Sequence, residues 1–190
     1  MNLCVFGASS DDIDSDYITA VRRLGQAMAA RGHTLIFGGG ATGLMGAVVN
    51  GASECNGHVI GIAPRFFDKP GILYDRCNEF IFTDTMRERK QMMEEKADAF
   101  IMVPGGIGTF EEFFEVLVLK QLDQLIKPIA VFNVKGYYDS FCRMMDNAES
   151  QGFMSHWCRS LYGVFSEAGE LLDYIEKGGM SDEISHHGQA

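Results

Sequence analysis

Short apolar runs alternate along the chain with longer stretches in which apolar residues recur at helical spacing. The short runs predict seven strands, at residues 3–6, 34–37, 59–62, 80–82, 99–103, 129–132 and 161–165. The longer stretches predict six helices, at residues 15–31, 43–55, 86–96, 110–122, 137–150 and 167–177. This alternation predicts an α/β protein with right-handed crossovers. We expect a Rossmann-like three-layer fold, a parallel sheet of about seven strands with helices on both faces.

The length favours a single domain. A chain of 190 residues, 46% hydrophobic and 22% charged, is large enough to bury a substantial core and has an ordinary globular composition. We expect one Rossmann-like domain over residues 1–178 and a polar, disordered tail over residues 179–190. Two prolines and a glycine predict an irregular loop over residues 64–78, and Gly32 and Gly57 are placed to end helices.

Charge and cysteine usage exclude several classes of partner. The formal net charge of −10 argues against nucleic acid, because such binding needs a broad basic surface. Neither a basic leader nor an apolar run long enough to span a bilayer is present, so no membrane partner is expected. The five cysteines are scattered and form no Cys-x-x-Cys pair, and the histidines lack ligand spacing. We therefore expect reduced thiols, a cytoplasmic location and no metal site.

The most informative segment is a glycine loop that follows the predicted strand at 99–103. Residues 104–109 read Pro-Gly-Gly-Ile-Gly-Thr, and the carboxylates of Glu111 and Glu112 come directly afterwards. A glycine loop between a strand and a helix presents free amide groups and the positive end of the helix dipole to an anion. Carboxylates beside a bound phosphate indicate chemistry on a phosphorylated molecule.

A second glycine loop, at residues 38–43, matches the pattern G-x-G-x-x-G between a strand and a helix. By itself it fits a tight turn as well as an anion site. The acidic residue that would hold an NAD ribose is missing after the next strand, where Arg65 would suit a 2′-phosphate and leaves NADP binding open. A third loop, at residues 7–10, offers hydroxyls, although an N-cap or turn is its simpler interpretation. All three loops leave carboxyl ends of strands, so we expect one composite site there.

Glu112 has two interpretations. Thr109 as N-cap and Glu112 three residues later form the pattern of a capping box, which would explain Glu112 structurally. A catalytic role stays open because of the basic cluster at Arg87, Arg89 and Lys90. These cations lie in the first turns of a predicted helix, where they oppose the helix dipole and need a compensating anion.

Arg89 is the member of this cluster expected to point inward. It shares a helical face with Met86 and Met93, and an inward arginine needs a partner. Glu112 or a ligand phosphate would supply that partner. Thr85 and Glu88 are expected to cap this helix.

Taken together, the motifs at 38–46, 86–90 and 104–112, with Asn133–Tyr138, resemble the LONELY GUY family over roughly residues 3–155. Its members are cytokinin riboside 5′-monophosphate phosphoribohydrolases, long mislabelled as lysine decarboxylases. The resemblance implies a nucleotide-binding catalytic domain without cofactor or metal that acts as a homodimer. The implied reaction hydrolyses the N-glycosidic bond of a purine nucleoside 5′-monophosphate, AMP or N6-prenylated AMP, to free base and ribose 5-phosphate.

The resemblance also implies site residues. Arg89 and Glu112 would form the catalytic pair, in which Arg89 lowers the pKa of Glu112 and keeps it ionised to stabilise an oxocarbenium-like transition state. The implied substrate-binding residues are Ser9, Gly39, Gly40, Gly43, Met86, Lys90, Gly105, Gly106, Ile107, Gly108, Thr109, Phe110 and Glu111. Family members often carry Thr-Trp at Val118-Leu119 and Glu at Gly71, positions expected to border the base, so relaxed substrate selectivity is expected.

Three other functions share some of these features. A non-catalytic nucleotide or cofactor carrier would use the glycine loops without needing the pair of Arg89 and Glu112. An NADP-dependent oxidoreductase is the second alternative. A pyridoxal-phosphate decarboxylase is the weakest, because no lysine lies in a recognisable Schiff-base context. A serine hydrolase is disfavoured since no G-x-S-x-G elbow occurs.

Overall fold

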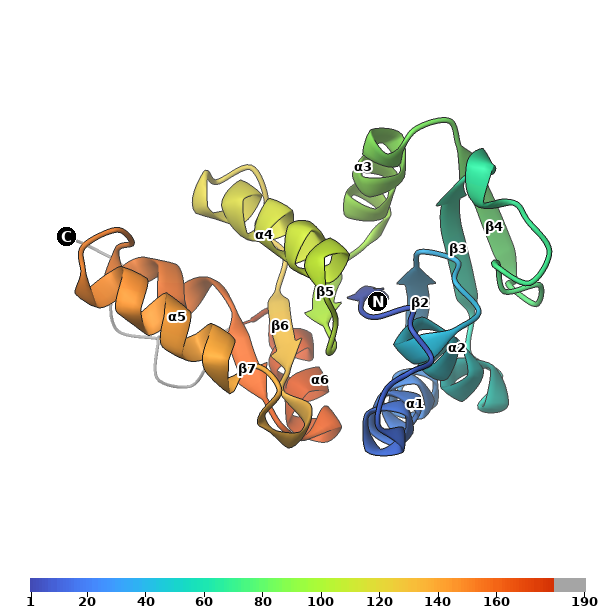
Figure 1. Ribbon diagram of the computed structural model, residues 1–190, viewed down its shortest axis with the longest axis horizontal. Helices are drawn as coiled ribbons and strands as arrows, with labels where there is room; N and C mark the ends of the chain where they lie inside the picture. The colour runs from blue at the N-terminus through green and yellow to red at the C-terminus, as the bar shows by residue number, and fades with distance from the viewer. Residues whose placement is uncertain (180–190) are drawn as a thin grey trace.

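The computed structural model describes residues 1–179, so the expected tail lies outside the described residues from position 180 onward. Its centre is a seven-stranded sheet in the order β4-β3-β2-β1-β5-β6-β7 with every neighbouring pair parallel, which confirms the predicted fold class (Figure 1). The strands are β1 (Asn2–Phe6), β2 (Thr34–Phe37), β3 (Val59–Pro64), β4 (Glu79–Thr83), β5 (Ala99–Met102), β6 (Ile129–Phe132) and β7 (Gly163–Phe165). The chain winds outward from β1 to β4 and then returns to β5 beside β1, so a topological switch point lies between β1 and β5.

Helices cover both faces of the sheet. The helices are α1 (Ser15–Ala30), α2 (Gly43–Glu54), α3 (Met86–Lys96), α4 (Ile107–Gln121), α5 (Asp139–Ser150) and α6 (Ala168–Glu176). Figure 1 shows α1, α2 and α6 on one side of the sheet and α3, α4 and α5 on the other. Short 3₁₀ turns occur at η1 (Arg65–Phe67), η2 (Val134–Gly136) and η3 (His156–Leu161). Over residues 1–179, none of the helices has the length and apolarity that crossing a bilayer requires.

The two cores follow from the alternation of side chains along the strands. In β1, Leu3 and Val5 face the core beneath α1, α2 and α6, whereas Phe6 faces the core beneath α3, α4 and α5. The sheet is therefore buried on both faces, which explains why its strands read as continuous apolar runs rather than alternating ones.

Several predicted boundaries need correction. The predicted start of α4 at Phe110 is wrong, because the helix begins at Ile107 with Gly106 as N-cap. The predicted capping box is therefore also wrong: Thr109 lies inside the first turn, and no side chain caps this helix. β7 is shorter than predicted because the 3₁₀ turn η3 occupies the residues before it.

The ends of α1 and α2 give one confirmation and one correction. Gly32 has a positive φ of 75° and ends α1 as predicted. After α2 the left-handed residue is Asn56, with a φ of 55°, and not the predicted Gly57. Asparagine tolerates this conformation because its short polar side chain can bond locally.

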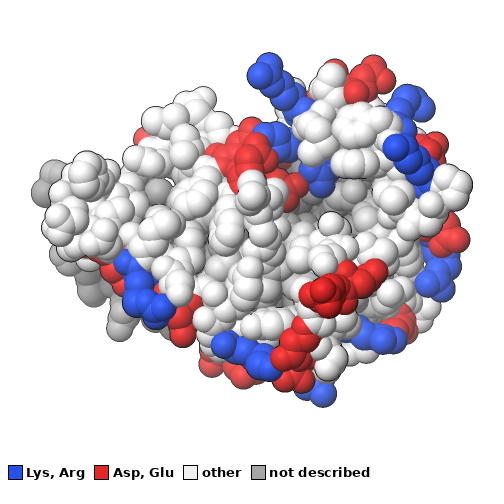
Figure 2. Space-filling view, viewed as in Figure 1, with Lys and Arg blue, Asp and Glu red and all other residues white. Residues whose placement is uncertain are grey.

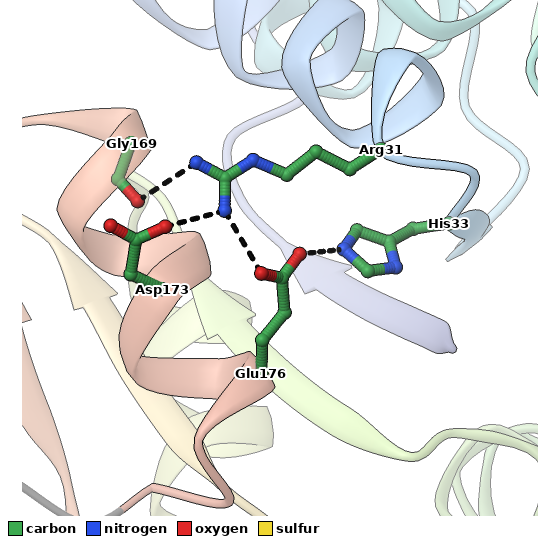
Figure 3. A network of polar contacts seen from close by, with 5 residues as sticks. All are labelled: Arg31, His33, Gly169, Asp173 and Glu176. Carbon is green, nitrogen blue, oxygen red and sulfur yellow. Dashed lines mark hydrogen bonds and ion pairs between the residues drawn. The ribbon is translucent and has the colours of Figure 1, made fainter.

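A polar network ties α6 to the layer formed by α1 (Figure 3). Arg31 Nη1 donates to Asp173 Oδ1 at 2.6 Å and to Glu176 Oε2 at 3.1 Å, and Nη2 donates to the Gly169 carbonyl at 3.4 Å. His33 Nε2 lies 2.8 Å from Glu176 Oε1. This network lies at the amino end of β2, opposite the carboxyl ends of the strands, so it fixes the last helix without approaching the predicted site.

Helices α1 and α2 approach one another closely through two glycines. A Cβ added to Gly51 would lie 2.0 Å from the carbonyl oxygen of Arg22, and one added to Gly25 would lie 2.2 Å from that of Val48. Backbone contacts this close cannot be relieved by rotating a side chain. The position of α2, whose N-terminus borders the predicted site, therefore depends on these glycines.

We expect Gly51→Ala to lower the free energy of unfolding by about 1–3 kcal/mol, because the added methyl group overpacks the contact between α1 and α2. Urea denaturation would measure this loss. Gly169→Ala in α6 is the matched control, since the nearest atom to its added Cβ lies 4.0 Å away. Equal stability of Gly51→Ala and the natural protein would contradict the proposed helix contact.

Candidate active site

A cleft of about 680 Å³ opens at the carboxyl ends of β1, β2 and β5. The three loops that the sequence analysis assigned to one composite site all line it, as do the loop after β3 and the first turns of α3 and α4. Figure 2 shows this face hollowed to the right of centre, between α3 above and α2 below. Among the lining residues that the structure describes, Arg89 and Glu112 are the charged ones.

The ion pair between Arg89 and Glu112 connects α3 to α4 across the cleft. Arg89 Nη1 donates to Glu112 Oε1 at 2.7 Å, and the side chains are only 11% and 13% exposed. Arg89 Nε also donates to the Ile62 carbonyl at the end of β3, at 3.2 Å. The predicted inward orientation of Arg89 is therefore confirmed, and Met93 is buried beside it. Met86 is different: it is 39% exposed and lines the cleft.

The local structure of α3 explains how Arg89 is presented. Thr85 Oγ1 accepts a hydrogen bond from the Glu88 amide at 3.1 Å, which confirms the predicted N-cap. Glu88 Oε2 accepts from the Asp84 amide at 2.9 Å. These bonds fix the first turn of α3, so Arg89 leaves the helix from a rigid base.

Gly38 is a site residue that the sequence analysis missed. A Cβ at this position would lie 2.1 Å from Arg89 Nη2. Glycine at the end of β2 therefore makes room for the guanidinium group. The G-x-G-x-x-G match drew attention to Gly38 only as part of a phosphate loop, and its contact partner lies far away in the sequence.

Arg89 lowers the pKa of Glu112 as expected, but its effect does not decide the net shift. Burial raises the pKa of Glu112, and the neighbouring Arg89 lowers it without outweighing the burial, so the pKa lies above its ordinary value. Arg89 thus keeps the Glu112 carboxylate oriented, while burial increases the affinity of this carboxylate for a proton. This combination suits a group that takes a proton from water during a reaction.

The N-terminus of α4 is open toward the cleft. Within residues 1–179, the amides of Ile107, Gly108 and Thr109 donate no hydrogen bond, and the first helical bond runs from Phe110 to the Gly106 carbonyl at 3.0 Å. Gly106, Gly108 and Thr109 line the cleft. Three free amides at the positive end of a helix are an arrangement that favours anion binding.

Two tyrosines hold the loop that precedes α4. The Tyr137 hydroxyl donates to the Gly105 carbonyl at 2.7 Å, and the Tyr138 hydroxyl donates to the Val103 carbonyl, also at 2.7 Å. Glycine is required at position 105, because a Cβ there would lie 2.1 Å from Thr109 Oγ1. The segment at 133–138, which entered the sequence analysis only as part of the family resemblance, therefore fixes the loop from behind.

The N-terminus of α2 is occupied by the protein itself. The Gly43 amide donates to Asp11 Oδ1 at 2.7 Å, and the amides of Leu44 and Met45 donate to the Ala8 carbonyl at 2.8 and 3.3 Å. The Asp11 carboxylate thus takes the place that an anion would occupy. Within residues 1–179, the first-turn amides of α4 are free, whereas those of α2 are bonded to the protein itself.

The cleft brings together part of the predicted site. It is lined by Ser9, Gly40, Met86, Arg89, Gly106, Gly108, Thr109 and Glu112. It is not lined by the other predicted residues, Gly39, Gly43, Lys90, Gly105, Ile107, Phe110 and Glu111. Lys90 pairs instead with Glu111 and with Glu115, at 2.7 Å from the latter.

Two further positions differ from expectation. Gly71 lines the cleft together with Phe67, Ile72 and Leu73. Val118 and Leu119 do not, and Val118 lies exposed on α4, so the expectation that this dipeptide borders the base is not supported by the cleft. Among residues 1–179 no cluster of three or more His, Cys, Asp or Glu is arranged to hold a metal ion.

The fold and the site together define a class of protein: a three-layer α/β protein with free helix N-terminal amides and a buried Arg–Glu pair at the carboxyl edge of its sheet. The family described as "Possible lysine decarboxylase" matches residues 45–175. The chain belongs to this family, whose curated relatives carry the name cytokinin riboside 5′-monophosphate phosphoribohydrolase.

Two relatives illustrate the similarity. The chain is 37% identical to LOG2 of Arabidopsis thaliana over 92% of this chain and 82% of that protein. It is 36% identical to LOG of Oryza sativa subsp. japonica over 92% of this chain and 72% of that protein. These relatives confirm the resemblance to the LONELY GUY family.

Solved structures at lower identity show the same fold. The molybdenum cofactor binding protein of Rippkaea orientalis superposes with a TM-score of 0.69 at 20% identity, covering 93% of this chain and 95% of that one. The molybdenum cofactor carrier protein of Chlamydomonas reinhardtii gives 0.70 at 20% identity, covering 93% and 96%. At this identity the likeness extends to the architecture alone.

Asp11→Ala should lower the free energy of unfolding by about 1 kcal/mol, because the Gly43 amide loses its capping carboxylate. Chemical denaturation monitored by circular dichroism would measure the change. Asp12→Ala is the control, since Asp12 is exposed and only its backbone amide is bonded, to Ser10 Oγ. A loss of similar size in both variants would show that the carboxylate does not cap α2.

Proposed function

We propose that this protein hydrolyses the N-glycosidic bond of purine nucleoside 5′-monophosphates, giving free base and ribose 5-phosphate. The observation that carries the proposal is the position of the ion pair of Arg89 and Glu112 beside the open N-terminus of α4 in one cleft. An anion site and a buried carboxylate are then one helical turn apart. The names of the curated relatives describe this class of hydrolase and support the assignment.

The geometry supports a division of roles. The amides of residues 107–109 hold the 5′-phosphate, and this remote binding energy orients the ribose. Glu112 faces the anomeric carbon, where its charge stabilises the oxocarbenium-like transition state and its oxygen takes a proton from the attacking water. The C1′–N bond breaks, the hydroxyl of water adds to C1′, and the proton taken by Glu112 passes on to the departing base, which regenerates the carboxylate. Arg89 orients the carboxylate and opposes the effect of burial on its pKa.

The site is proposed to comprise the residues that line the cleft. Arg89 and Glu112 form the catalytic pair, and Ser9, Gly40, Met86, Gly106, Gly108 and Thr109 bind substrate. The amide of Ile107 joins the phosphate site although its side chain points to solvent. No cofactor takes part in this scheme.

A second candidate is a non-catalytic carrier, because the structural neighbours named above bind or carry a cofactor. Binding alone would not need a carboxylate buried against an arginine, since such burial is costly. The two candidate functions are distinguished by incubating the protein with AMP and measuring by chromatography whether adenine and ribose 5-phosphate appear. Release of both products supports the hydrolase, and AMP bound but unchanged supports the carrier.

Assembly and location also belong to this proposal. We infer a homodimer, as the family resemblance implies. Exposed apolar side chains on α4, on α5 and just after these helices offer it an interface, among them Val118, Leu122, Met144 and Phe153. Figure 2 shows mostly uncharged surface over these helices on the face drawn. All five cysteines are free thiols, which suits a reducing, cytoplasmic compartment. The acidic net charge of −10 favours small-molecule substrates over nucleic acid or membrane surfaces.

Glu112→Gln should reduce kcat for AMP by at least about a hundredfold, because the amide keeps the shape but loses the charge that stabilises the transition state. In the natural protein the rate should fall on the acid side with an apparent pKa above the usual value of about 4.3, since burial raises the pKa of Glu112 and the ionised form is the active one. Glu95→Gln, exposed on the same face of the fold, is the control. Normal turnover by Glu112→Gln would refute the assigned role.

The 5′-phosphate should be required for efficient hydrolysis. Adenosine should have a kcat/KM at least about a hundredfold below that of AMP, because it cannot use the amides at the N-terminus of α4. Product formation from both compounds under identical conditions measures the ratio. Comparable values would remove the argument for a phosphate site.

Selectivity for the substituent on the base should be relaxed. The wall formed by Phe67, Gly71, Ile72 and Leu73 carries no charged or hydrogen-bonding side chain, and apolar contacts discriminate by only about 1–3 kcal/mol. AMP and N6-prenylated AMP should both be cleaved, with specificity constants within roughly two orders of magnitude. A much larger preference for either substrate would show that polar groups outside this wall select the base.

A further inference from the structure

Lys90 occupies a different place from its neighbour Arg89. Its ammonium group contacts Glu111 and lies 2.7 Å from Glu115 Oε2, and both carboxylates come from α4. The Lys90 side chain is only 15% exposed and does not line the cleft. Its donors therefore point at α4 and away from the space in which a substrate would lie.

The surroundings of Lys90 are strongly acidic. Besides Glu111 and Glu115, Glu94 and Glu112 border the small space next to the Lys90 side chain. Burial lowers the pKa of Lys90, but the hydrogen bonds to Glu111 and Glu115 outweigh it, so the group stays charged. Burial and the nearby Glu115 together raise the pKa of Glu94. Without the lysine, carboxylates of α3 and α4 would face one another across the gap.

The two helices share β1 but otherwise rest on different elements. α3 packs mainly on β3 and β4, whereas α4 packs on β1 and η3, and Figure 1 shows both on the same face. The catalytic pair has one member on each helix, so its geometry depends on the separation between them. Lys90 forms the second ionic bridge across this separation, directly beside the first.

We propose that Lys90 is a positioning residue: it clamps α3 to α4 through Glu111 and Glu115 and thereby holds Arg89 and Glu112 in register. The family resemblance implies instead that Lys90 holds the substrate. This proposal rests on the proposed hydrolase function and gives Lys90 a positioning role in it. A displacement of about 1 Å in a catalytic group can cost around a hundredfold in rate, so the clamp would act on turnover rather than on binding.

The test compares Lys90→Met with Lys90→Arg. Kinetics with AMP give kcat and KM, and calorimetry gives the Kd of ribose 5-phosphate as a readout independent of turnover. We expect Lys90→Met to lower kcat by about tenfold to a hundredfold while KM and Kd change by less than about twofold. Lys90→Arg keeps the charge and should recover most of kcat. Arg87→Met, which removes an exposed cation three residues before Lys90, should leave all three quantities unchanged.

The carboxylate partners provide a second, independent variant. Glu111→Gln combined with Glu115→Gln should lower kcat as Lys90→Met does, and adding Lys90→Met to that pair should lower it no further, because the same clamp is already broken. This comparison also decides the matter if Lys90→Met alone does not fold.

Two results would overturn the clamp. A rise of about tenfold or more in KM and in the Kd of ribose 5-phosphate, with kcat preserved, would make Lys90 a phosphate ligand. Unchanged kinetics in Lys90→Met would show that Lys90 neither clamps α3 to α4 nor binds the phosphate. Both results presuppose that the natural protein cleaves AMP. Failure of that cleavage would instead refute the proposed function, so the two failures are distinguishable.

Discussion

The ion pair between Arg89 and Glu112 is the interaction on which the rest of the site depends. Burying two charges carries a desolvation cost that their attraction offsets only when the geometry is good and further hydrogen bonds are made. Here the Ile62 carbonyl accepts a second bond from the guanidinium, and Gly38 leaves space for it. The ends of β2 and β3 are thus shaped around one side chain of α3. An uncharged partner at either position would leave the other charge buried and unpaired.

The two glycine loops show how similar sequences reach different local chemistry. Before α2, the Asp11 carboxylate accepts a hydrogen bond from the Gly43 amide. This bond holds the segment after β1 against the N-terminus of α2. Before α4, the amides remain free, and Tyr137 and Tyr138 hold the backbone from behind. Of the two helix N-termini at this cleft, the one at α4 therefore offers its first-turn amides to a ligand anion. The difference arises from residues distant in sequence from both loops.

The fold could be predicted from the sequence because strands buried on both faces read as continuous apolar runs. Left-handed residues that follow helices, such as Gly32 after α1, also mark where helices end. Helix boundaries were predicted wrongly where no side chain caps the helix. Gly106 is the N-cap of α4 and has no capping side chain, so the pattern of Thr109 and Glu112 predicted a helix start that is three residues too late. The inward orientation of the Arg89 side chain could be predicted from its helical spacing to Met93. The roles of Gly38 and Asp11 could not be foreseen, because each depends on a contact between distant segments. The net effect on the pKa of Glu112 also required the depth of burial, which sequence does not give.

The measurement that tests the central claim most directly is a crystal structure of the Glu112→Gln variant with AMP. The account predicts phosphate oxygens within hydrogen-bond distance of the amides of Ile107, Gly108 and Thr109. It also predicts that C1′ of the ribose lies beside residue 112 and that Asp11 still caps α2. A phosphate bound at the N-terminus of α2 with Asp11 displaced, or a ribose turned away from residue 112, would contradict it.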